Sequence, residues 1–206
     1  MPQSRMARLT RADSQAVTRE RLLQSAKTLF ISDGYVATSV ERIADAAGFS
    51  KGAVYSNFDS KEALFLVLVE LKMAADREAV TRILAETTTA SDLIAGLKRH
   101  YAQHVEVLDF TLVVAEFNTQ VGRGSPFAAQ YADYVRGQRE GLGALIGVIF
   151  ERAGKRPPAP LPDLAASLIG LTLGLSIQRG ADREAITAEL WARALEMMLK
   201  GWLILA

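Results

Sequence analysis

The sequence of 206 residues contains no cysteine, which excludes disulfides, thiolate metal sites and a cysteine nucleophile. It also lacks a glycine-rich phosphate loop, a Gly-x-Ser-x-Gly nucleophile motif and any acidic pair with catalytic spacing. Alternating strand patterns and Asn-Gly hairpin signals are missing as well. We therefore expect an all-α protein of the cytoplasm that is not an enzyme and needs no cofactor or metal.

Charge is unevenly distributed along a chain whose 24 basic and 23 acidic residues nearly cancel. Residues 1–61 hold nine Lys and Arg against six Asp and Glu, and most of that excess comes from Arg5, Arg8 and Arg11. We expect residues 1–12 to form a basic arm, which is either a solvated tail or a segment that follows DNA phosphates or a minor groove. The arm has no apolar core typical of a secretory signal.

Apolar residues recur at helical spacing along nearly the whole chain. A typical stripe consists of Leu22, Leu23, Ala26, Leu29 and Phe30, which fall on one face of a helix. This periodicity and the turn residues between stripes predict about nine helices, at about 13–32, 38–47, 50–57, 61–85, 92–108, 109–121, 125–153, 163–179 and 182–203.

Several helix ends carry local signals. Gly34 and Gly48 stand where a left-handed residue ends a helix. The segments 38–41 and 59–62 read Thr-Ser-Val-Glu and Asp-Ser-Lys-Glu, so each fits a capping box that opens a helix. Ser50 is expected to cap the short helix between them.

One uncharged apolar segment, Leu164 to Gln178, requires a check for membrane insertion. Its fifteen residues span about 22 Å as a helix, which is shorter than the hydrocarbon core of about 30 Å. We therefore expect a buried or interface helix and no membrane partner.

The most informative stretch, residues 38–62, predicts two short helices joined by a turn at Gly48, which is the layout of a helix-turn-helix. Within it, the segment from Ala44 to Phe65 reads ADAAGFSKGAVYSNFDSKEALF. This segment resembles the amino-terminal DNA-binding domain of TetR-family transcriptional regulators. The preceding residues from Leu23 to Thr38 resemble that family's first helix and entry turn. The resemblance covers residues 18–66, about a quarter of the chain.

The amino-terminal end of a recognition helix docks in the major groove, where backbone N–H groups meet phosphates or base edges. Ser50, Lys51 and Gly52 occupy that end of the expected third helix. The resemblance implies that Lys51 contacts phosphate or base, that Gly52 lets the backbone approach, and that Lys61 contacts phosphate. The candidate DNA-binding residues are Thr38, Arg42, Ser50, Lys51, Gly52, Tyr55, Ser56, Asn57 and Lys61.

Some of these positions have a simpler alternative. Lys51 is otherwise a solvated surface lysine. Tyr55 either packs on a sugar and donates to phosphate or belongs to the core. Arg42 either joins the contacts or forms an ion pair with Glu41 or Asp45.

Two positions near the end of the recognition helix depart from the family pattern. Ser56 and Asn57 replace the aromatic or histidine residues that are common there. Asn57 has the chemistry to pair with adenine. Thr38, as the expected helix cap, and Lys61 position the domain on DNA and do not read sequence.

The resemblance implies a helix-turn-helix domain at 13–60 and a helical effector-binding and dimerisation domain at 61–206. It predicts a repressor that responds to a largely apolar small molecule and binds a palindromic operator in double-stranded DNA as a homodimer. One alternative is an activator with the same DNA-binding domain. The other is a helical small-molecule-binding protein or enzyme whose helix-turn-helix is only structural.

Polar and aromatic residues on the middle helices are candidates for the effector pocket, although each also fits an ordinary core or surface position. They are Tyr101, His104, Phe110, Glu116, Phe117, Asn118 and Tyr134. The last two helices are the expected dimer interface, with an intramolecular core as the alternative. Its candidate residues are Leu168, Gly170, Leu171, Gly174, Leu175, Trp191, Leu195, Met198 and Trp202.

Overall fold

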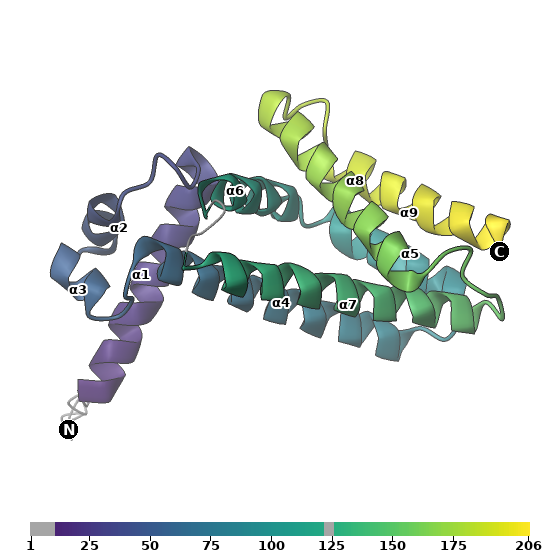
Figure 1. Ribbon diagram of the computed structural model, residues 1–206, viewed down its shortest axis with the longest axis horizontal. Coiled ribbons are helices and arrows are strands. Elements are labelled where there is room, and N and C mark those ends of the chain that lie inside the picture. Colours follow the sequence, from purple (N-terminus) through teal and green to yellow (C-terminus); the bar gives the residue numbers. More distant parts are fainter. Residues whose placement is uncertain (1–10, 122–125) are drawn as a thin grey trace, which may run out of the picture. The chain divides into compact units, whose positions relative to one another are not determined.

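The computed structural model describes residues 11–121 and 126–206, and these residues form nine helices and no strand. The all-α prediction is therefore confirmed (Figure 1). Residues 1–10 of the expected basic arm and most of the expected turn at 122–126 lie outside the described residues. The chain divides into two compact units, residues 1–70 and 71–206, which we call the head and the body.

The described part of the head consists of α1 (Arg11–Asp33), α2 (Val40–Ala47), α3 (Lys51–Tyr55) and the first part of α4 (Lys61–Glu86). Helices α1, α2 and α3 pack against one another. The rings of Phe30, Tyr35 and Phe65 meet with centroids 5.1–5.4 Å apart, and all three side chains are buried. Burial of these large rings supplies much of the hydrophobic stabilisation of the head.

The glycine signals at the helix ends are confirmed, whereas both capping-box predictions are off by one residue. Gly34 and Gly48 adopt positive φ angles of 87° and 75°. The hydroxyl oxygen of Ser39, not of Thr38, accepts the Arg42 N–H that caps α2. Ser60, not Asp59, accepts from the backbone at the start of α4.

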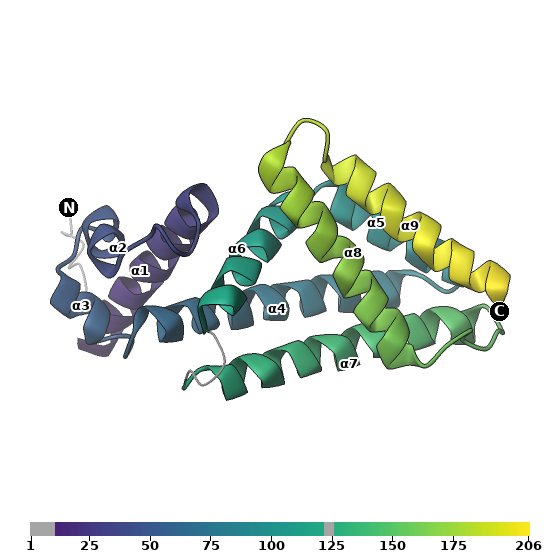
Figure 2. The ribbon, with the colours of Figure 1, turned by 45° about the horizontal axis from the view of Figure 1, so that its top comes forward.

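The described body contains the rest of α4 with α5 (Ala90–Ala102), α6 (Glu106–Val121), α7 (Ala128–Arg152), α8 (Leu161–Ala181) and α9 (Ala188–Leu205). Helix α5 packs along α9, and α8 packs across both α6 and α7 (Figure 2). One buried cluster joins α5, α7, α8 and α9, and a second joins α6, α8 and α9. Apolar contacts in these two clusters hold the body together.

Two predicted boundaries in the body are wrong. The break expected at 108/109 falls earlier, because α5 ends at Ala102 and the backbone turns through His104 before α6 begins. No glycine or proline signals this turn. Helix α9 begins at Ala188 instead of 182, because Asp182 is extended and Thr187 provides the cap.

Candidate nucleic-acid interface

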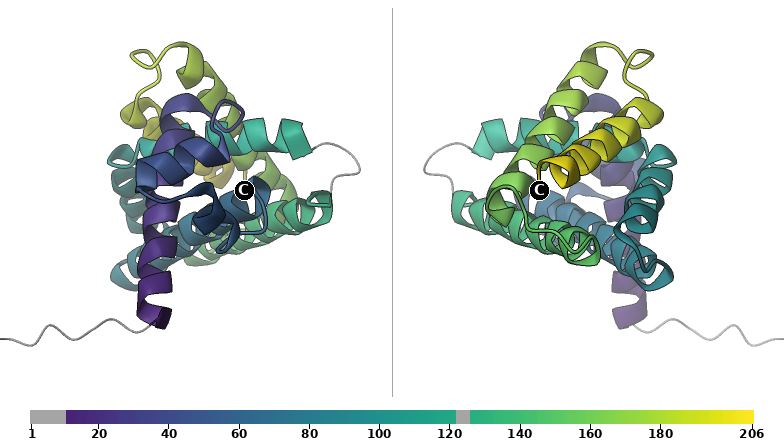
Figure 3. Two further views of the ribbon diagram at one scale, coloured as in Figure 1. Left: turned by 90° about the vertical axis from the view of Figure 1, so that its left-hand side faces the viewer. Right: turned by 90° about the vertical axis from the view of Figure 1, so that its right-hand side faces the viewer.

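Helices α2 and α3 form a tight pair joined at Gly48, as expected for a helix-turn-helix (Figure 3, left). The left-handed Gly48 reverses the chain and lets the backbone N–H of Phe49 donate to the Ala44 carbonyl oxygen over 2.9 Å. The hydroxyl of Ser50 accepts from the Ala53 N–H and opens α3, which confirms the predicted cap. The side chains of Ile43 and Val54 are fully buried and lock the two helices together.

The start of α3 presents an exposed surface. Ser50, Lys51, Gly52, Tyr55 and Ser56 are all exposed. Tyr55 is 48% exposed, so the alternative that it is a core tyrosine is wrong. This surface offers a hydroxyl, a cation, a phenol and an accessible backbone, which are the groups that contact phosphates and base edges.

The ammonium group of Lys51 forms an ion pair with the carboxylate of Glu41, which lies in the first turn of α2. The two side chains are 52% and 54% exposed. Hydrogen bonding and charge attraction lower the pKa of Glu41 and raise the pKa of Lys51. Lys51 also lies 5.8 Å from the ring centroid of Tyr55.

The guanidinium of Arg42 donates to Asp33 at the end of α1, with 2.6 Å between Nη2 and Oδ2. The predicted alternative of an ion pair with Glu41 or Asp45 is therefore wrong about the partner. Asp33 escaped notice because it is nine positions away in sequence, and the reversal between α1 and α2 brings it close.

Lys61 is half-buried and turned toward the interior of the head. Its ammonium group donates to the carbonyl oxygen of Tyr35 over 2.6 Å and lies 4.1 Å from the centroid of the same ring. A phosphate contact would require Lys61 to leave this position, so its DNA role stays a prediction.

The side chain of Thr38 is part of the buried core of the head. It is 1% exposed, and its hydroxyl donates to the carbonyl oxygen of Gly34 over 2.8 Å. Because a buried hydroxyl already used inside the protein is unavailable to DNA, we remove Thr38 from the candidate interface and assign it to the turn after α1.

Asn57 is also held within the head. Its amide nitrogen donates to the Ala53 carbonyl oxygen over 2.8 Å. Its Oδ1 atom is buried. Bidentate recognition of adenine requires both amide atoms, so this arrangement argues against base readout by Asn57.

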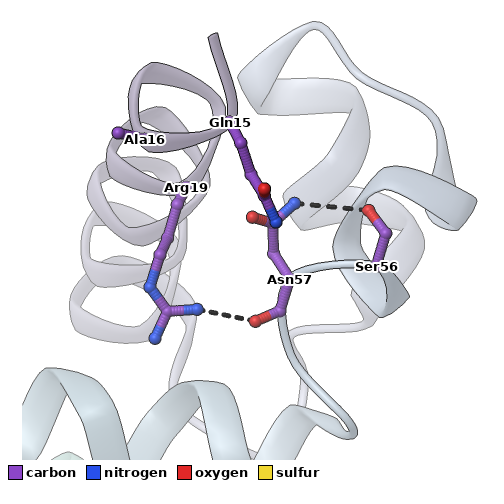
Figure 4. A pocket seen from close by; sticks show the side chains of 5 residues that line it. All are labelled: Gln15, Ala16, Arg19, Ser56 and Asn57. Carbon is purple, nitrogen blue, oxygen red and sulfur yellow. Dashed lines mark hydrogen bonds between the residues drawn. The ribbon is translucent and has the colours of Figure 1, made fainter. Parts of the chain in front are cut away.

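Arg19 was missed by the sequence analysis. Its Nη1 donates to the Asn57 backbone carbonyl over 2.6 Å (Figure 4), and its guanidinium stacks 4.2 Å from the Phe58 ring centroid. Gln15, Ala16, Arg19, Ser56 and Asn57 line a surface pocket here. Arg19 thus ties α1 to the segment that directly follows α3.

The candidate effector residues divide between the interior and the surface of the body. Phe110 and Phe117 are buried, and the Phe117 ring contacts Tyr131 with centroids 5.7 Å apart. Asn118 is exposed, whereas Glu116 is half-buried. Of these four, Asn118 is the one that the structure places away from the interior.

Two of the other candidate effector residues, Tyr101 and Tyr134, are affected by the charge of an acidic residue that the sequence analysis missed, and the third, His104, lies beside His100. The rings of Tyr101 and Trp191 are 4.7 Å apart, and the ring of His104 lies 4.2 Å from that of His100. Burial raises the pKa of Tyr101 and of Tyr134, and the negative charge of Asp76 on α4 raises both further.

Asp76 itself pairs with Lys72 one turn earlier on α4. Its spacing from Lys72 resembles an ordinary surface pair on a helix, so no sequence signal distinguished it. Among the described residues no group of three or more His, Cys, Asp or Glu could hold a metal ion.

The predicted dimer residues also fall into two groups. Leu168, Leu175, Trp191 and Leu195 are buried in the core of the body, so for these residues the intramolecular alternative is correct. Leu171, Met198 and Trp202 are half-buried and pack on the same cluster.

Gly170 and Gly174 have open surroundings, because a Cβ atom added to either would meet nothing within 4 Å. Helices α8 and α9 (Figure 3, right) also expose apolar residues that the sequence analysis missed. These are Ile177, Met197, Ile204 and Leu205, which are 55–82% exposed.

Helix α8 is, within the described residues, long and apolar enough to cross a membrane by length and composition alone. Only 28% of its most apolar window is buried inside the body. Of the two alternatives expected for this segment, a buried helix or an interface helix, complete burial within the body is thus excluded.

Comparison with known proteins assigns the head to a family. Residues 22–68 match the family described as bacterial regulatory proteins, tetR family. Over 122 residues the chain is 30% identical to the HTH-type transcriptional repressor AcnR of Corynebacterium efficiens, and the alignment covers 59% of this chain. The chain spans 60% of the length of that repressor.

Solved structures extend the likeness in fold to about nine-tenths of the chain. FadR from Bacillus subtilis in complex with stearoyl-CoA has a TM-score of 0.69 at 16% identity, covering 88% of this chain and 98% of FadR. A transcriptional regulator from Saccharomonospora viridis in complex with choline has a TM-score of 0.72 at 18% identity, covering 90% and 96% of the two chains. These similarities establish a shared fold.

Proposed function

We propose that this chain is a ligand-responsive repressor that binds a palindromic operator, because residues 22–68 match the tetR family of bacterial regulatory proteins. The observation that carries this proposal is the exposed start of α3, where Ser50, Lys51, Gly52 and Tyr55 share one surface of a helix-turn-helix. These residues enter the major groove, and Arg42 and Ser56 extend the contact. Residues 1–12 follow the adjacent DNA backbone as a basic arm.

Operator binding requires two heads, because one helix-turn-helix covers only a few base pairs. A two-fold pair places two recognition helices about 34–36 Å apart, one turn of DNA. The exposed apolar surface of α8 and α9 supports such a pair, with Gly170 and Gly174 allowing close approach of the helices. Two copies then form a four-helix bundle.

An effector binds within the body, in the region around Asp76. The negative charge of this carboxylate adds to burial in raising the pKa values of Tyr101 and Tyr134, on α5 and α7, and it opposes the lowering of the pKa of His100 by burial. The rings provide an apolar wall and the phenols provide hydrogen bonds, which is the usual composition of a small-molecule site. The stearoyl-CoA and choline complexes of proteins with this fold support a small-molecule ligand.

Helix α4 transmits the signal, because this single helix begins in the head at Lys61 and ends in the body at Glu86. Effector contacts near Asp76 shift α4, and the two heads then no longer match adjacent grooves. A difference of about 1–3 kcal/mol between the two states gives a 5–150-fold change in DNA affinity.

The test is titration of fluorescent DNA from beside the protein's own gene, with a scrambled duplex of equal length as control. We expect the native fragment to bind at least tenfold more tightly at moderate salt. Equal binding of the two duplexes would favour the small-molecule-binding protein with a structural helix-turn-helix. Deletion of the gene then distinguishes a repressor from an activator, because the levels of neighbouring transcripts rise if the protein is a repressor and fall if it is an activator.

A further inference from the structure

Each described cation of the candidate DNA surface is already bound within the head. Lys51 is held by Glu41, Arg42 by Asp33, and Lys61 by the carbonyl oxygen of Tyr35. In the first two cases the partner is a carboxylate, which presents to the cation the same charge and paired oxygens that a phosphate would present.

Exchange of partner changes the energetics of DNA binding. A free lysine that binds phosphate releases a counterion from the DNA, and each such contact steepens the dependence of log K on log salt by about 0.9. When Lys51 must first leave Glu41, the exposed carboxylate takes up a cation in its place. The net number of ions released therefore falls by up to one.

We propose that Glu41 is an internal competitor for Lys51, which limits the affinity of the head for every DNA duplex and flattens its salt dependence. This inference rests on the proposed DNA-binding function and adds to it a residue that sets affinity without reading sequence. Asp33 competes with DNA in the same way for Arg42, at the junction of α1 and α2.

The position of Glu41 also has a purely structural explanation, because a carboxylate in the first turn of α2 is attracted to the positive end of the helix dipole. The two roles differ in what they require of Lys51. A dipole effect acts on the stability of the head and is the same whether or not Lys51 is present. Competition for Lys51 acts on DNA binding and disappears when Lys51 is replaced.

The test compares Glu41→Gln with a control, Asp45→Asn. The control removes an equal charge one turn further along α2. Asp45 is exposed and forms no ion pair within the described structure. DNA affinity is measured from low to moderate salt on the native promoter fragment and on a scrambled duplex. An exposed ion pair changes an equilibrium constant by about two- to fivefold. We expect Glu41→Gln to bind both duplexes more tightly than Asp45→Asn by this factor at low salt, with a salt slope steeper by up to about 0.9.

A double-mutant cycle provides the decisive control. In a Lys51→Gln background, Glu41→Gln should bind no more tightly than Asp45→Asn, because there is no lysine left to release. Circular dichroism and thermal unfolding of every variant establish that the head is folded before its affinity is compared.

Three results would overturn the inference. Equal affinities for Glu41→Gln and Asp45→Asn would reduce the effect to net charge. Persistence of the gain without Lys51 would show that Glu41 acts through another group. Weaker binding of the promoter fragment alone would make Glu41 a base-contacting residue. Wild-type protein that ignores both duplexes would instead overturn the proposed function together with this inference.

Discussion

The head and the body differ in the kind of side chain that they expose to solvent. In the head, the largest apolar side chains such as Phe30 and Phe65 are fully buried, and the exposed charges of Lys51 and Arg42 are paired. In the body, two contacting helices expose apolar side chains, including Ile177 and Met197. The head thus presents paired charges suited to a charged partner, whereas the body presents apolar side chains suited to an apolar one.

The largest expected effect tests the apolar surface of the body. Ile177→Glu introduces a carboxylate on the outer surface of α8, where the side chain is 55% exposed and the body itself tolerates the change. Because a two-fold interface contains the substitution twice, we expect dimerisation to weaken by about 3–6 kcal/mol. Analytical ultracentrifugation should then show monomers at concentrations where the wild-type protein is a dimer.

The matched control for this change is Leu71→Glu, which alters an equally exposed apolar residue on α4. It should leave the dimer intact. Dissociation by both variants, or by neither, would remove α8 from the interface and with it the contrast between the two units.

The second prediction concerns the independence of the head. Phe30→Ala removes a fully buried ring that contacts Tyr35 and Phe65, and such deletions cost about 3–5 kcal/mol. Hydrogen exchange should accelerate throughout α1, α2 and α3 while α8 and α9 keep their protection. Uniform acceleration over the whole chain would show that head and body unfold as one unit.

Sequence reasoning succeeded best where the chain is governed by local chemistry. The start of α3 and the reversal at Gly48 follow from one serine and one glycine, so both could be predicted. The partners of Arg42 and Lys61 could not, because Asp33 and the Tyr35 carbonyl reach them only through the fold. Helical periodicity likewise identified α8, but it does not distinguish burial in the same chain from burial in a second copy.

The third prediction tests the correction made for Thr38. Thr38→Val keeps the shape of the side chain and removes the hydroxyl that donates to Gly34 and, over 3.3 Å, to Leu29. We expect the head to lose about 1 kcal/mol of stability, because buried acceptors lose their donor. Chemical denaturation measures this loss. The DNA affinity of the folded variant should be unchanged, and weaker binding at every salt concentration would return Thr38 to the interface.

The smallest expected effect is a pH dependence confined to the body. Burial lowers the pKa of His100, and the positive charge of His104 lowers it further. Asp76 opposes this shift, whereas Lys72 and Arg82 add to it. Since protonation then favours the unfolded chain, the stabilisation is complete above the unfolded pKa of about 6.5 and is lost as pH falls through the lower folded value.

Measurement of the thermal midpoint at pH 7.5 and pH 5.5 isolates this contribution, because most carboxylates keep their charge across that interval. Wild-type protein should lose more stability over the interval than His100→Gln, which cannot be protonated. The difference should appear in the body and not in hydrogen exchange of the head, whose described residues include no histidine. Parallel pH profiles of the wild-type protein and the variant would mean that His100 is solvated. This result would remove His100 from the group of side chains that we propose as the effector site.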